Sequence, residues 1–341
     1  MKLSILIHAL NEEKLIANCL ESALEEARKS DGEVILVDSL STDKTVEIAR
    51  NYPIRIIQFL NKADCSAASA VQAGYQYANG ESEFLYVLDG DMVLQPGFIS
   101  AAMNYLESNP DVAGVAGKVL DTSIKSWADR RRASVAKAQQ QIVEVSELGG
   151  GGLYRRSAIE SVDYLAHRWL RACEEAELGA RLRAKGWRLI RLPEIAVIHT
   201  GYSESTSKML RRLWRNRQMH AYGTYLRTSF RRPWWWLTVC QLWFLFATVI
   251  LHIMAGILAV LGAMQLELIN TITALIASEI LIWSGAILVL AIRKRSITDA
   301  IISIYTWNCY SLAAVLGFSQ STPDPNIPIC GQELTISLLP K

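Results

Sequence analysis

Short apolar runs alternate with helix-like segments over the first quarter of the chain. Runs typical of buried strands lie at 2–7, 33–37, 54–59 and 84–88. Between them, apolar residues recur at helical spacing in 15–24, 46–49 and 67–78. This alternation predicts an α/β fold in which a mostly parallel sheet carries helices on both faces.

The pattern is less regular after residue 91. A strand is expected at 112–119, a polar helix or loop at 127–145, and a helix around the acids at 174–177. Two short strands, 187–192 and 195–199, complete the soluble part of the chain.

Two long apolar runs, 234–261 and 268–292, follow in the second half of the chain. Each is long enough to cross a hydrocarbon core of about 30 Å at about 1.5 Å per residue. We interpret them as a transmembrane helical hairpin. A third apolar segment, 297–318, includes Asp299 and Asn308. We expect it to lie against the membrane or return to the soluble domain, with a third span as the alternative.

Basic residues gather directly before the first apolar run. The stretch 208–232 carries lysines and arginines but no acid, with apolar residues at near-helical spacing. A basic segment next to a span marks the cytoplasmic face of a membrane. We therefore expect a cytoplasmic domain at 1–205, an amphipathic interface helix at 206–232, the hairpin at 233–294, and a membrane-associated helix with a tail at 295–341.

Composition narrows the class of protein further. The hydrophobic content of 51% and the mean hydropathy of +0.17 are high for a soluble protein, which agrees with a location in the inner (plasma) membrane. The six cysteines show no paired spacing, which argues against a zinc site or a disulfide framework. Because the basic run continues straight into an apolar span, no nucleic acid is expected as a partner.

Two aspartates, Asp89 and Asp91, follow the apolar run at 84–88 with Gly90 between them. The carboxyl edge of a parallel sheet is where α/β proteins bind ligands. Carboxylates this close repel each other unless a positive charge lies between them. The pattern favours a divalent cation at this edge, and a solvated Asp-Gly turn is the alternative.

Further motifs stand in an order that resembles a known family. Along the chain they read LIHALNEE, ILVDSLSTDKT, FLYVLDGD, GGGGLYRR, EEAELGARLRAKGWRL and VIHTG. This series is similar to that of a family 2 glycosyltransferase with the GT-A (Rossmann-like) fold, over roughly residues 3–202. The motif RRLWRNRQMH before the hairpin extends the resemblance to membrane-anchored members that act on lipid-linked acceptors.

In this family the acidic pair holds Mg²⁺ or Mn²⁺, which bridges the diphosphate of a nucleotide sugar. The resemblance assigns metal contacts to Asp91, Asp89 and His199, and a packed, hydrogen-bonded histidine is the alternative for the last of these. It also implies a nucleotide pocket, with a UDP-sugar as the expected donor. The pocket residues are Ala9, Asn11, Glu12, Asp38, Asp89, Gly90 and Asp91. Asp38 would accept a hydrogen bond from the base, whereas turn capping is the alternative for Asn11.

The inverting chemistry of the family needs a carboxylate that takes a proton from the acceptor hydroxyl. Glu175 stands where the resemblance expects an aspartate, and Glu174 precedes it. The sequence leaves open which of the two is the base. Acids that merely favour a helix start are the alternative interpretation.

Five polar residues of the basic stretch complete the candidate sites: Arg211, Arg212, Arg215, Gln218 and His220. Arginine forks suit phosphate oxygens, so these residues are expected to hold the phosphate of a polyprenyl-linked acceptor. Attraction to anionic membrane lipids is the alternative.

The sequence thus predicts an inverting, metal-dependent glycosyltransferase. It would move a sugar from a nucleotide donor to a polyprenyl-diphosphate-linked acceptor in polysaccharide or glycolipid synthesis. One alternative makes polyprenyl monophosphate the acceptor, and another makes the protein a non-catalytic nucleotide-sugar-binding membrane scaffold. Membrane lipids are expected partners, and a homo-oligomer formed through the hairpins stays open.

Overall fold

The computed structural model describes residues 1–201, 204–265 and 270–334. The chain forms two compact units. The first, here called the sheet unit, comprises Met1–Met209, Thr228–Leu237 and Thr322–Lys341. The second, the helical unit, comprises Leu210–Arg227 and Thr238–Ser321.

The sheet unit is built on a sheet with the strand order β10-β3-β2-β1-β4-β8-β6-β9-β5, in which β7 also pairs with β9. The neighbours from β3 to β4 and the pair β6 and β9 run parallel, and the remaining pairs are antiparallel. The strands are β1 (Leu3–Ala9), β2 (Gly32–Asp38), β3 (Arg55–Phe59), β4 (Phe84–Asp89), β5 (Met92–Leu94), β6 (Val112–Asp121), β7 (Val143–Glu144), β8 (Gly152–Arg155), β9 (Arg188–His199) and β10 (Gly331–Leu334).

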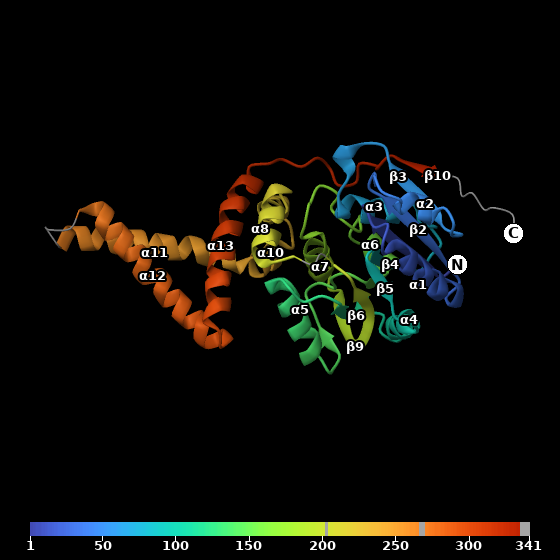
Figure 1. Cartoon of the computed structure of the whole chain (residues 1–341), viewed down its shortest axis with the longest axis horizontal. Coiled ribbons are helices and arrows are strands. Elements are labelled where there is room, and N and C mark those ends of the chain that lie inside the picture. Colours follow the sequence, from blue (N-terminus) through green and yellow to red (C-terminus); the bar gives the residue numbers. More distant parts are fainter. Residues whose placement is uncertain (202–203, 266–269, 335–341) are drawn as a thin grey trace. The chain divides into compact units, whose positions relative to one another are not determined.

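Helices cover both faces of this sheet (Figure 1). On one face Leu3, Ile5 and Ile7 pack with α1 and α4, and on the other face Leu6 packs with α3 and α7. This division follows from the two-residue period of a strand. The helices are α1 (Ile16–Lys29), α2 (Thr45–Ala49), α3 (Ala67–Tyr77), α4 (Phe98–Ser108), α5 (Trp127–Ala138), α6 (Arg156–Glu160) and α7 (Glu174–Ala184), with a 3-10 turn η1 (Lys62–Asp64).

The predicted fold class is confirmed, with a sheet that is mixed rather than mostly parallel. The predicted strands of the first quarter coincide with β1 to β4, which form its parallel half. The two short strands expected at 187–192 and 195–199 are wrong, because they form the single strand β9. Pro193 lies in its middle, where the pairing with β6 shifts register, so the strand tolerates a residue without an N–H.

Several short elements were not expected from the sequence, namely β5, α4, β7, β8 and β10. The strands among them have four residues or fewer, too short for an alternating pattern to be distinctive. For β10 the reason is also distance, because its partner β3 lies near the other end of the chain.

A buried ion pair fixes helix α7. Glu177 and Arg181 are 1% and 2% exposed, and Arg181 Nε lies 2.9 Å from both carboxylate oxygens. Arg181 Nη1 donates to the carbonyls of Val162 and Tyr164 at 2.8 Å each. The Tyr164 hydroxyl in turn donates to Glu177 at 2.7 Å. These contacts hold α7 to the segment that follows α6.

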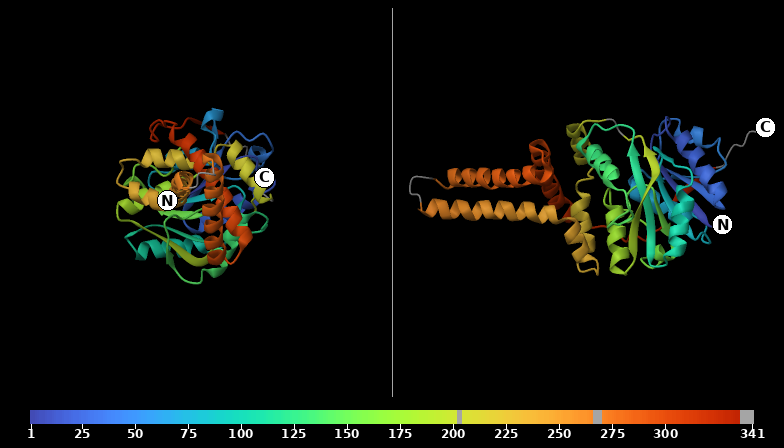
Figure 2. Two further views of the ribbon diagram at one scale, coloured as in Figure 1. Left: turned by 90° about the vertical axis from the view of Figure 1, so that its left-hand side faces the viewer. Right: turned by 90° about the horizontal axis from the view of Figure 1, so that it is seen from below.

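The chain between residues 206 and 318 is helical almost throughout, and the ends of some of its helices belong to the sheet unit. Within the helical unit, α11 and α12 form a long hairpin, and α13 runs across one end of it (Figure 2). The helices are α8 (Thr206–Arg215), α9 (Ala221–Ser229), α10 (Trp235–Gln241), α11 (Trp243–Gln265), α12 (Thr271–Lys294) and α13 (Ile297–Phe318).

Three of these helices, α11, α12 and α13, are long and apolar enough to cross a membrane. The expected hairpin corresponds to α11 and α12, and the separate helix α10 occupies the start of the first predicted run. The predicted start of the second run, Leu268, lies outside the described residues. The basic stretch expected as one helix contains two, α8 and α9, because Arg217 between them adopts a left-handed φ of 58°.

Replacing Arg181 by alanine should destabilise the sheet unit, because Glu177 would stay buried without its partner. Removing one member of a buried ion pair typically costs about 3–5 kcal/mol. Thermal unfolding of the purified protein measures the effect. Arg183→Ala on the same helix is the matched control and should change little. An Arg181→Ala variant as stable as this control would contradict the role given to the pair.

Candidate active site

Parallel pairing brings the carboxyl ends of β1, β2 and β4 together. In the observed register, Ala9 lies opposite Asp38, and His8 lies opposite Asp89. Both aspartates are the last residues of their strands. The sheet therefore gathers these side chains at the edge where α/β folds bind ligands.

Side-chain hydrogen bonds stabilise the loops that follow β1 and β2. Asn11 Oδ1 accepts from the backbone N–H of Thr42 at 2.8 Å, so Asn11 does stabilise the turn. Asp38 is fully buried at the end of β2 and accepts from Gln58 Nε2 at 2.8 Å. The position of the Asp38 carboxylate is thus set by the neighbouring strand β3.

Glu12 lies close to the aspartates because Gly90 has no side chain. A Cβ on Gly90 would lie 3.0 Å from Ala9 Cβ and 3.3 Å from Glu12 Cγ. Burial, together with neighbouring carboxylates of which Asp91 is the strongest, raises the pKa of Glu12 to about 7. A carboxyl with this pKa indicates a crowded acidic site.

His8 is the counter-charge of Asp89. Its Nε2 lies 2.8 Å from Asp89 Oδ1. Burial alone would lower the pKa of His8, but the Asp89 carboxylate outweighs it and raises the pKa above the ordinary value. Burial likewise favours a neutral Asp89, and His8 more than offsets this and lowers the pKa of Asp89.

A chain of alternating charges leads from Asp91 into the protein. His199 Nε2 lies 3.3 Å from Asp91 Oδ2, and His199 Nδ1 lies 2.7 Å from Asp121 Oδ1. Arg132 makes two bonds of 3.0 Å to Asp121 and one of 2.7 Å to Asp129. Burial opposes the charge on His199, yet the two flanking carboxylates raise its pKa to about 9. The chain holds His199 and Asp91 in place.

Glu174 and Glu175 begin α7 and contribute to the same cavity as Asp89. Cys173, with a left-handed φ of 67°, turns the chain into the helix. Burial raises the pKa of both glutamates, and Glu174 and Asp89 raise the pKa of Glu175 further. A raised pKa suits a carboxylate that has to accept a proton near neutral pH.

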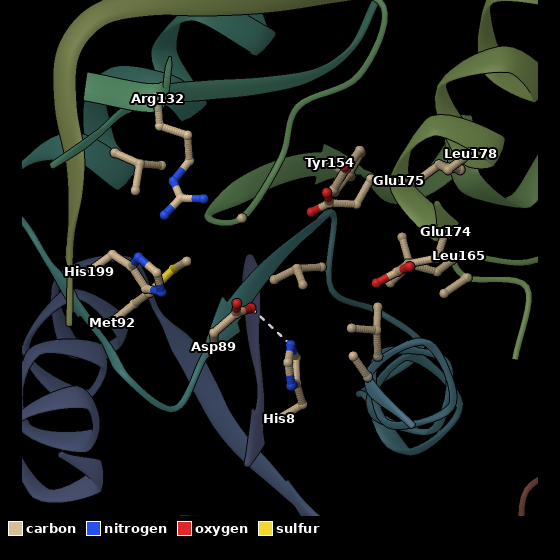
Figure 3. A pocket seen from close by; sticks show the side chains of 16 residues that line it. His8, Asp89, Met92, Arg132, Tyr154, Leu165, Glu174, Glu175, Leu178 and His199 are labelled. Atoms are coloured by element: carbon tan, nitrogen blue, oxygen red, sulfur yellow. Dashed lines mark ion pairs between the residues drawn. The ribbon is translucent and has the colours of Figure 1, made fainter. Parts of the chain in front are cut away.

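These groups surround a cavity of about 280 Å³. In Figure 3, His199 and Arg132 lie on one side of Asp89, and Glu174 and Glu175 lie on the other. The volume is near the lower end of the roughly 300–1,000 Å³ typical of small-molecule pockets. Acids from two separate elements thus converge on a space that a substrate could enter.

A second cavity, of about 440 Å³, adjoins the first and shares Val119, Arg132 and Gly150 with it. Helix α5 and strand β6 contribute most of its wall. Because these lining residues are common to both, the two cavities are direct neighbours.

The second cavity is lined by cations. Lys118, Arg131 and Arg191 contribute to it, and among the residues that the structure describes none of them has a carboxylate within ion-pair distance. Arg191 is held in place by a hydrogen bond to the carbonyl of Leu148 at 2.5 Å. Trp127, 5.8 Å from the Arg131 guanidinium, adds an aromatic surface. Glu147 is the acid that also lines this cavity, against the basic residues Lys118, Arg131, Arg132 and Arg191, so the second cavity is more basic than the first.

The first cavity offers an oxygen suited to a divalent cation. Asp91 Oδ1 is buried and has no hydrogen-bond partner within the described residues. In that same part of the chain, no group of three His, Cys, Asp or Glu side chains is already arranged around a metal position. Mg²⁺ commonly takes one or two carboxylates and completes its shell with water and substrate phosphates. The residues present fit a cation bound together with a phosphate-bearing substrate.

Most of the predicted site residues lie at this edge of the sheet unit. Asp89, Glu174, Glu175 and His199 line the first cavity, and Asp91 contacts His199. The adjoining strand ends and loops carry Ala9, Asn11, Glu12, Asp38 and Gly90. By contrast, the predicted acceptor residues belong to the helical unit. They are Arg211, Arg212 and Arg215 on α8, and Gln218 and His220 in the turn before α9.

The sequence did not single out His8, Asp121, Arg132 or Arg191. Asp121 ends β6 as Asp38 and Asp89 end their strands, so the same signal was present. It was overlooked because the predicted strand stopped at residue 119. His8 could have been found as the one ionisable residue of β1.

Two family models match the chain. The model described as glycosyl transferase family 2 matches residues 4–163, and that described as glycosyl transferase family group 2 matches residues 84–314. The second match extends from β4 through the cavity residues of α7 and β9 into α13.

Individual relatives are more distant. A curated protein of Methanococcus voltae is 23% identical to this chain over 306 residues, which cover 81% of this chain and 88% of the relative. Its name is dolichyl N-acetyl-alpha-D-glucosaminyl phosphate 3-beta-D-2,3-diacetamido-2,3-dideoxy-beta-D-glucuronosyltransferase. The mannosyltransferase PcManGT from Pyrobaculum calidifontis, solved with GDP-Man and Mn²⁺, is 16% identical with a TM-score of 0.56, covering 93% of this chain and 86% of its own. S. aureus TarS 1-349 is 18% identical with a TM-score of 0.48, and the match covers 68% of this chain and 73% of the TarS chain. At such identities the likeness to PcManGT shows a shared fold.

Mn²⁺ should raise the thermal unfolding temperature of the purified protein, because it would partner the free oxygen of Asp91 and relieve the repulsion among the acids. A ligand at about 100 times its Kd stabilises a fold by about 2.7 kcal/mol. Asp91→Asn should lose most of this rise. Asp111→Asn, which alters an exposed aspartate bound to Arg188, is the control and should keep it. An equal rise in both variants would place the cation elsewhere.

Proposed function

The chain belongs to glycosyl transferase family group 2, and on this premise we propose an inverting, metal-dependent transfer of a sugar from a nucleotide-sugar donor to a lipid-linked acceptor. The observation that carries the proposal is the convergence of Asp89, Glu174 and Glu175 on one cavity at the carboxyl edge of the sheet. Dense negative charge at this edge suits a substrate that arrives with a divalent cation.

The donor occupies the side of the cavity next to β1 and β2. The base is proposed to replace Gln58 as the hydrogen-bond donor to the buried Asp38, and the loop of Asn11 and Glu12 is proposed to border the nucleotide. Bound Mg²⁺ or Mn²⁺ supplies Lewis-acid stabilisation of the leaving diphosphate. Asp91 and Asp89 would hold this cation, and His199 would be the third contact after exchanging Asp91 for the metal at its Nε2, since both of its ring nitrogens face carboxylates in the structure. Support comes from PcManGT, which shares the fold and was solved with GDP-Man and Mn²⁺. A UDP-sugar is the proposed donor.

Glu175 is the proposed base, and Glu174 is the alternative. Glu175 takes the proton of the acceptor hydroxyl while that oxygen attacks the anomeric carbon, and the bond from this carbon to the diphosphate breaks. One displacement of this kind inverts the anomeric configuration. Burial and the neighbouring acids Glu174 and Asp89 raise the pKa of Glu175, which strengthens it as a proton acceptor.

The acceptor enters through the second cavity. Its cations Lys118, Arg131 and Arg191 suit a phosphate, and the surface of Trp127 suits a sugar or an isoprenoid chain. Because the two cavities are neighbours, an acceptor phosphate held in the second would place the acceptor sugar near Glu175 in the first. The relative from Methanococcus voltae, whose name states a dolichyl phosphate-linked acceptor, supports this class of substrate.

The helical unit anchors the enzyme in the membrane. Its arginines Arg211, Arg212 and Arg215 are proposed to meet anionic headgroups or the phosphate of the lipid acceptor, with Gln218 and His220 beside them. The basic stretch before the hairpin favours a cytoplasmic sheet unit on the inner (plasma) membrane.

The proposal is tested by supplying a panel of UDP-, GDP- and dTDP-sugars to the purified protein with Mn²⁺, with or without a membrane lipid extract. We expect one donor to be consumed, more rapidly with lipid, and a glycolipid of inverted configuration to appear. Tight donor binding without turnover under every condition would instead support the non-catalytic scaffold.

Glu175→Gln should bind the donor normally but lose transfer, because the amide cannot accept the proton. A positioned base contributes about 10²–10⁴-fold, and the loss in kcat should lie in this range. Glu174→Gln is the matched variant and should lose less. Donor affinity by calorimetry and kcat by product formation separate the two effects. The reverse order of losses would make Glu174 the base.

Arg131→Ala should raise the KM for the lipid acceptor by about 10-fold or more, because loss of a hydrogen bond to a charged group costs about 1.5–3 kcal/mol. Hydrolysis of the donor without acceptor should not change. Arg130→Ala alters the neighbouring exposed arginine, which does not line the cavity, and is the control. Equal acceptor KM values in the two variants would remove the acceptor from this cavity.

A further inference from the structure

Strand β10 belongs to the sheet unit although it follows all the apolar helices in the chain. It pairs antiparallel with β3, so that Gly331 lies opposite Phe59. Arg55 on β3 makes two hydrogen bonds, of 2.8 and 3.2 Å, with the Glu333 carboxylate. The sheet that carries the site thus includes a strand from the far end of the chain.

The segment before β10 is held to the same unit. Ile329 is 3% exposed and packs in the core on the α3 face of the sheet. The Tyr77 hydroxyl bonds to both the carbonyl and the N–H of Gly331, at 3.0 and 3.1 Å. Arg168 Nη1 donates to the carbonyl of Ile327 at 2.6 Å. The contacts extend over the whole stretch 327–334.

This attachment limits how often the chain can cross a membrane. The chain leaves the sheet unit after Leu237 and re-enters it at Thr322. In the described part of the chain, the helices long enough to span, α11, α12 and α13, all lie between these points. A folded unit lies on one side of a bilayer, so the number of complete crossings between them must be even. Two crossings meet this condition, and three do not.

Helix α13 differs from α11 and α12 in its direction. Trp307 packs edge-on against Trp243 at 5.1 Å between ring centroids, and it also meets Phe244. His252 Nε2 lies 3.0 Å from Asn308 Oδ1. These contacts with α11 fall within one turn of α13, as expected for helices that cross rather than run side by side. Figures 1 and 2 show α13 lying across the hairpin.

One face of α13 is an exposed apolar stripe. Its residues recur at near-helical spacing and are each at least 46% exposed: Ile297, Ile301, Tyr305, Leu312 and Leu316. The cations Arg293, Lys294 and Arg295 immediately precede the helix. An exposed apolar helix face needs lipid or another apolar surface to cover it, and the three cations mark the membrane face at which α12 ends.

Another part of α13 is attached to α9, a helix of the basic stretch. A Cβ on Gly223 would collide with the carbonyl of Ala314, and one on Gly317 would collide with the backbone of the turn before α9. The helices therefore touch through glycines. Arg227 Nη1 donates to the carbonyl of Phe318 at 2.8 Å, at the end of α13.

We propose that the chain crosses the membrane twice, through α11 and α12, and that α13 lies in the interface on the side of the sheet unit with its apolar stripe against lipid. The chain then returns through 322–330 to end as β10 in the sheet. The sheet unit is thereby connected to the bilayer on both sides of the hairpin, and two connections restrict its orientation at the membrane more than one would.

A polar cluster fixes where α13 crosses the hairpin. His252 on α11 lies 3.0 Å from Glu279 on α12 through Nδ1, while its other ring nitrogen faces Asn308 on α13. Trp283 Nε1 donates to Glu279 at 2.8 Å. Ionisable groups in apolar helices are costly unless paired, and here the pairing joins all three helices.

Sidedness can be measured with a protease-recognition sequence inserted after Gln320, between α13 and β10, in sealed vesicles of known orientation. Reference insertions after Gly80 in the sheet unit and in the chain between α11 and α12 report the two sides. The protease should cleave the Gln320 site only when it is present on the side of the membrane from which it cleaves the Gly80 site. Cleavage by protease on the side that reaches the insertion between α11 and α12 would establish a third crossing and overturn the proposal.

A cysteine cross-link tests the return of the chain without any insertion. Gln58 and Gln332 face each other in the register of β3 and β10. Oxidised membranes containing Gln58→Cys/Gln332→Cys should yield, after digestion, a disulfide-linked peptide pair by mass spectrometry. Gln58→Cys/Gln320→Cys and the unaltered protein are controls and should not yield one. Absence of the link in a variant that unfolds at the normal temperature would overturn the proposal, whatever the result for sugar transfer.

Discussion

Carboxylates of β4 and α7 converge on one small cavity, and their mutual repulsion has to be offset by the surrounding protein. Two histidines offset most of this repulsion between carboxylates. His8 pairs with Asp89 within the parallel half of the sheet, and His199 stands between Asp91 and Asp121. The repulsion is not fully offset, because one buried carboxylate oxygen of Asp91 has no hydrogen-bond partner among the described residues. That residual negative charge is what a divalent cation would neutralise.

The adjoining cavity is more basic than the first, and in the proposed function this contrast would separate the two substrates. A donor that carries a cation is favoured among the acids, whereas an acceptor phosphate without one is favoured beside Lys118, Arg131 and Arg191. The proposed base Glu175 lies at the first cavity, and its charge is also felt by Arg191 in the second. Under the proposed function, two anionic substrates would be brought together because each would meet a different local charge.

The parts of the site that the sequence predicted are those encoded locally. Asp38 and Asp89 were found because each ends an apolar run, and parallel pairing then places them at one edge. Asp121 was not found because the predicted strand stopped at residue 119, and His8 was not found because its role depends on Asp89 on a neighbouring strand. Strand β10 was missed for the same reason, since only the fold shows that Glu333 pairs with Arg55. Non-local pairing leaves no periodic trace in a single sequence.

The central claim is that Asp91 and the donor diphosphate share one cation. Electron paramagnetic resonance of Mn²⁺ with the purified protein and a nucleotide-sugar donor tests it most directly. When phosphate oxygens bind Mn²⁺, the adjacent phosphorus nuclei give a hyperfine coupling to the electron spin of the metal that can be resolved. The account predicts a protein-bound Mn²⁺ signal with phosphorus coupling, and loss of the bound signal in Asp91→Asn. A spectrum of free Mn²⁺ that protein and donor leave unchanged, or a bound signal that Asp91→Asn retains in full, would contradict it.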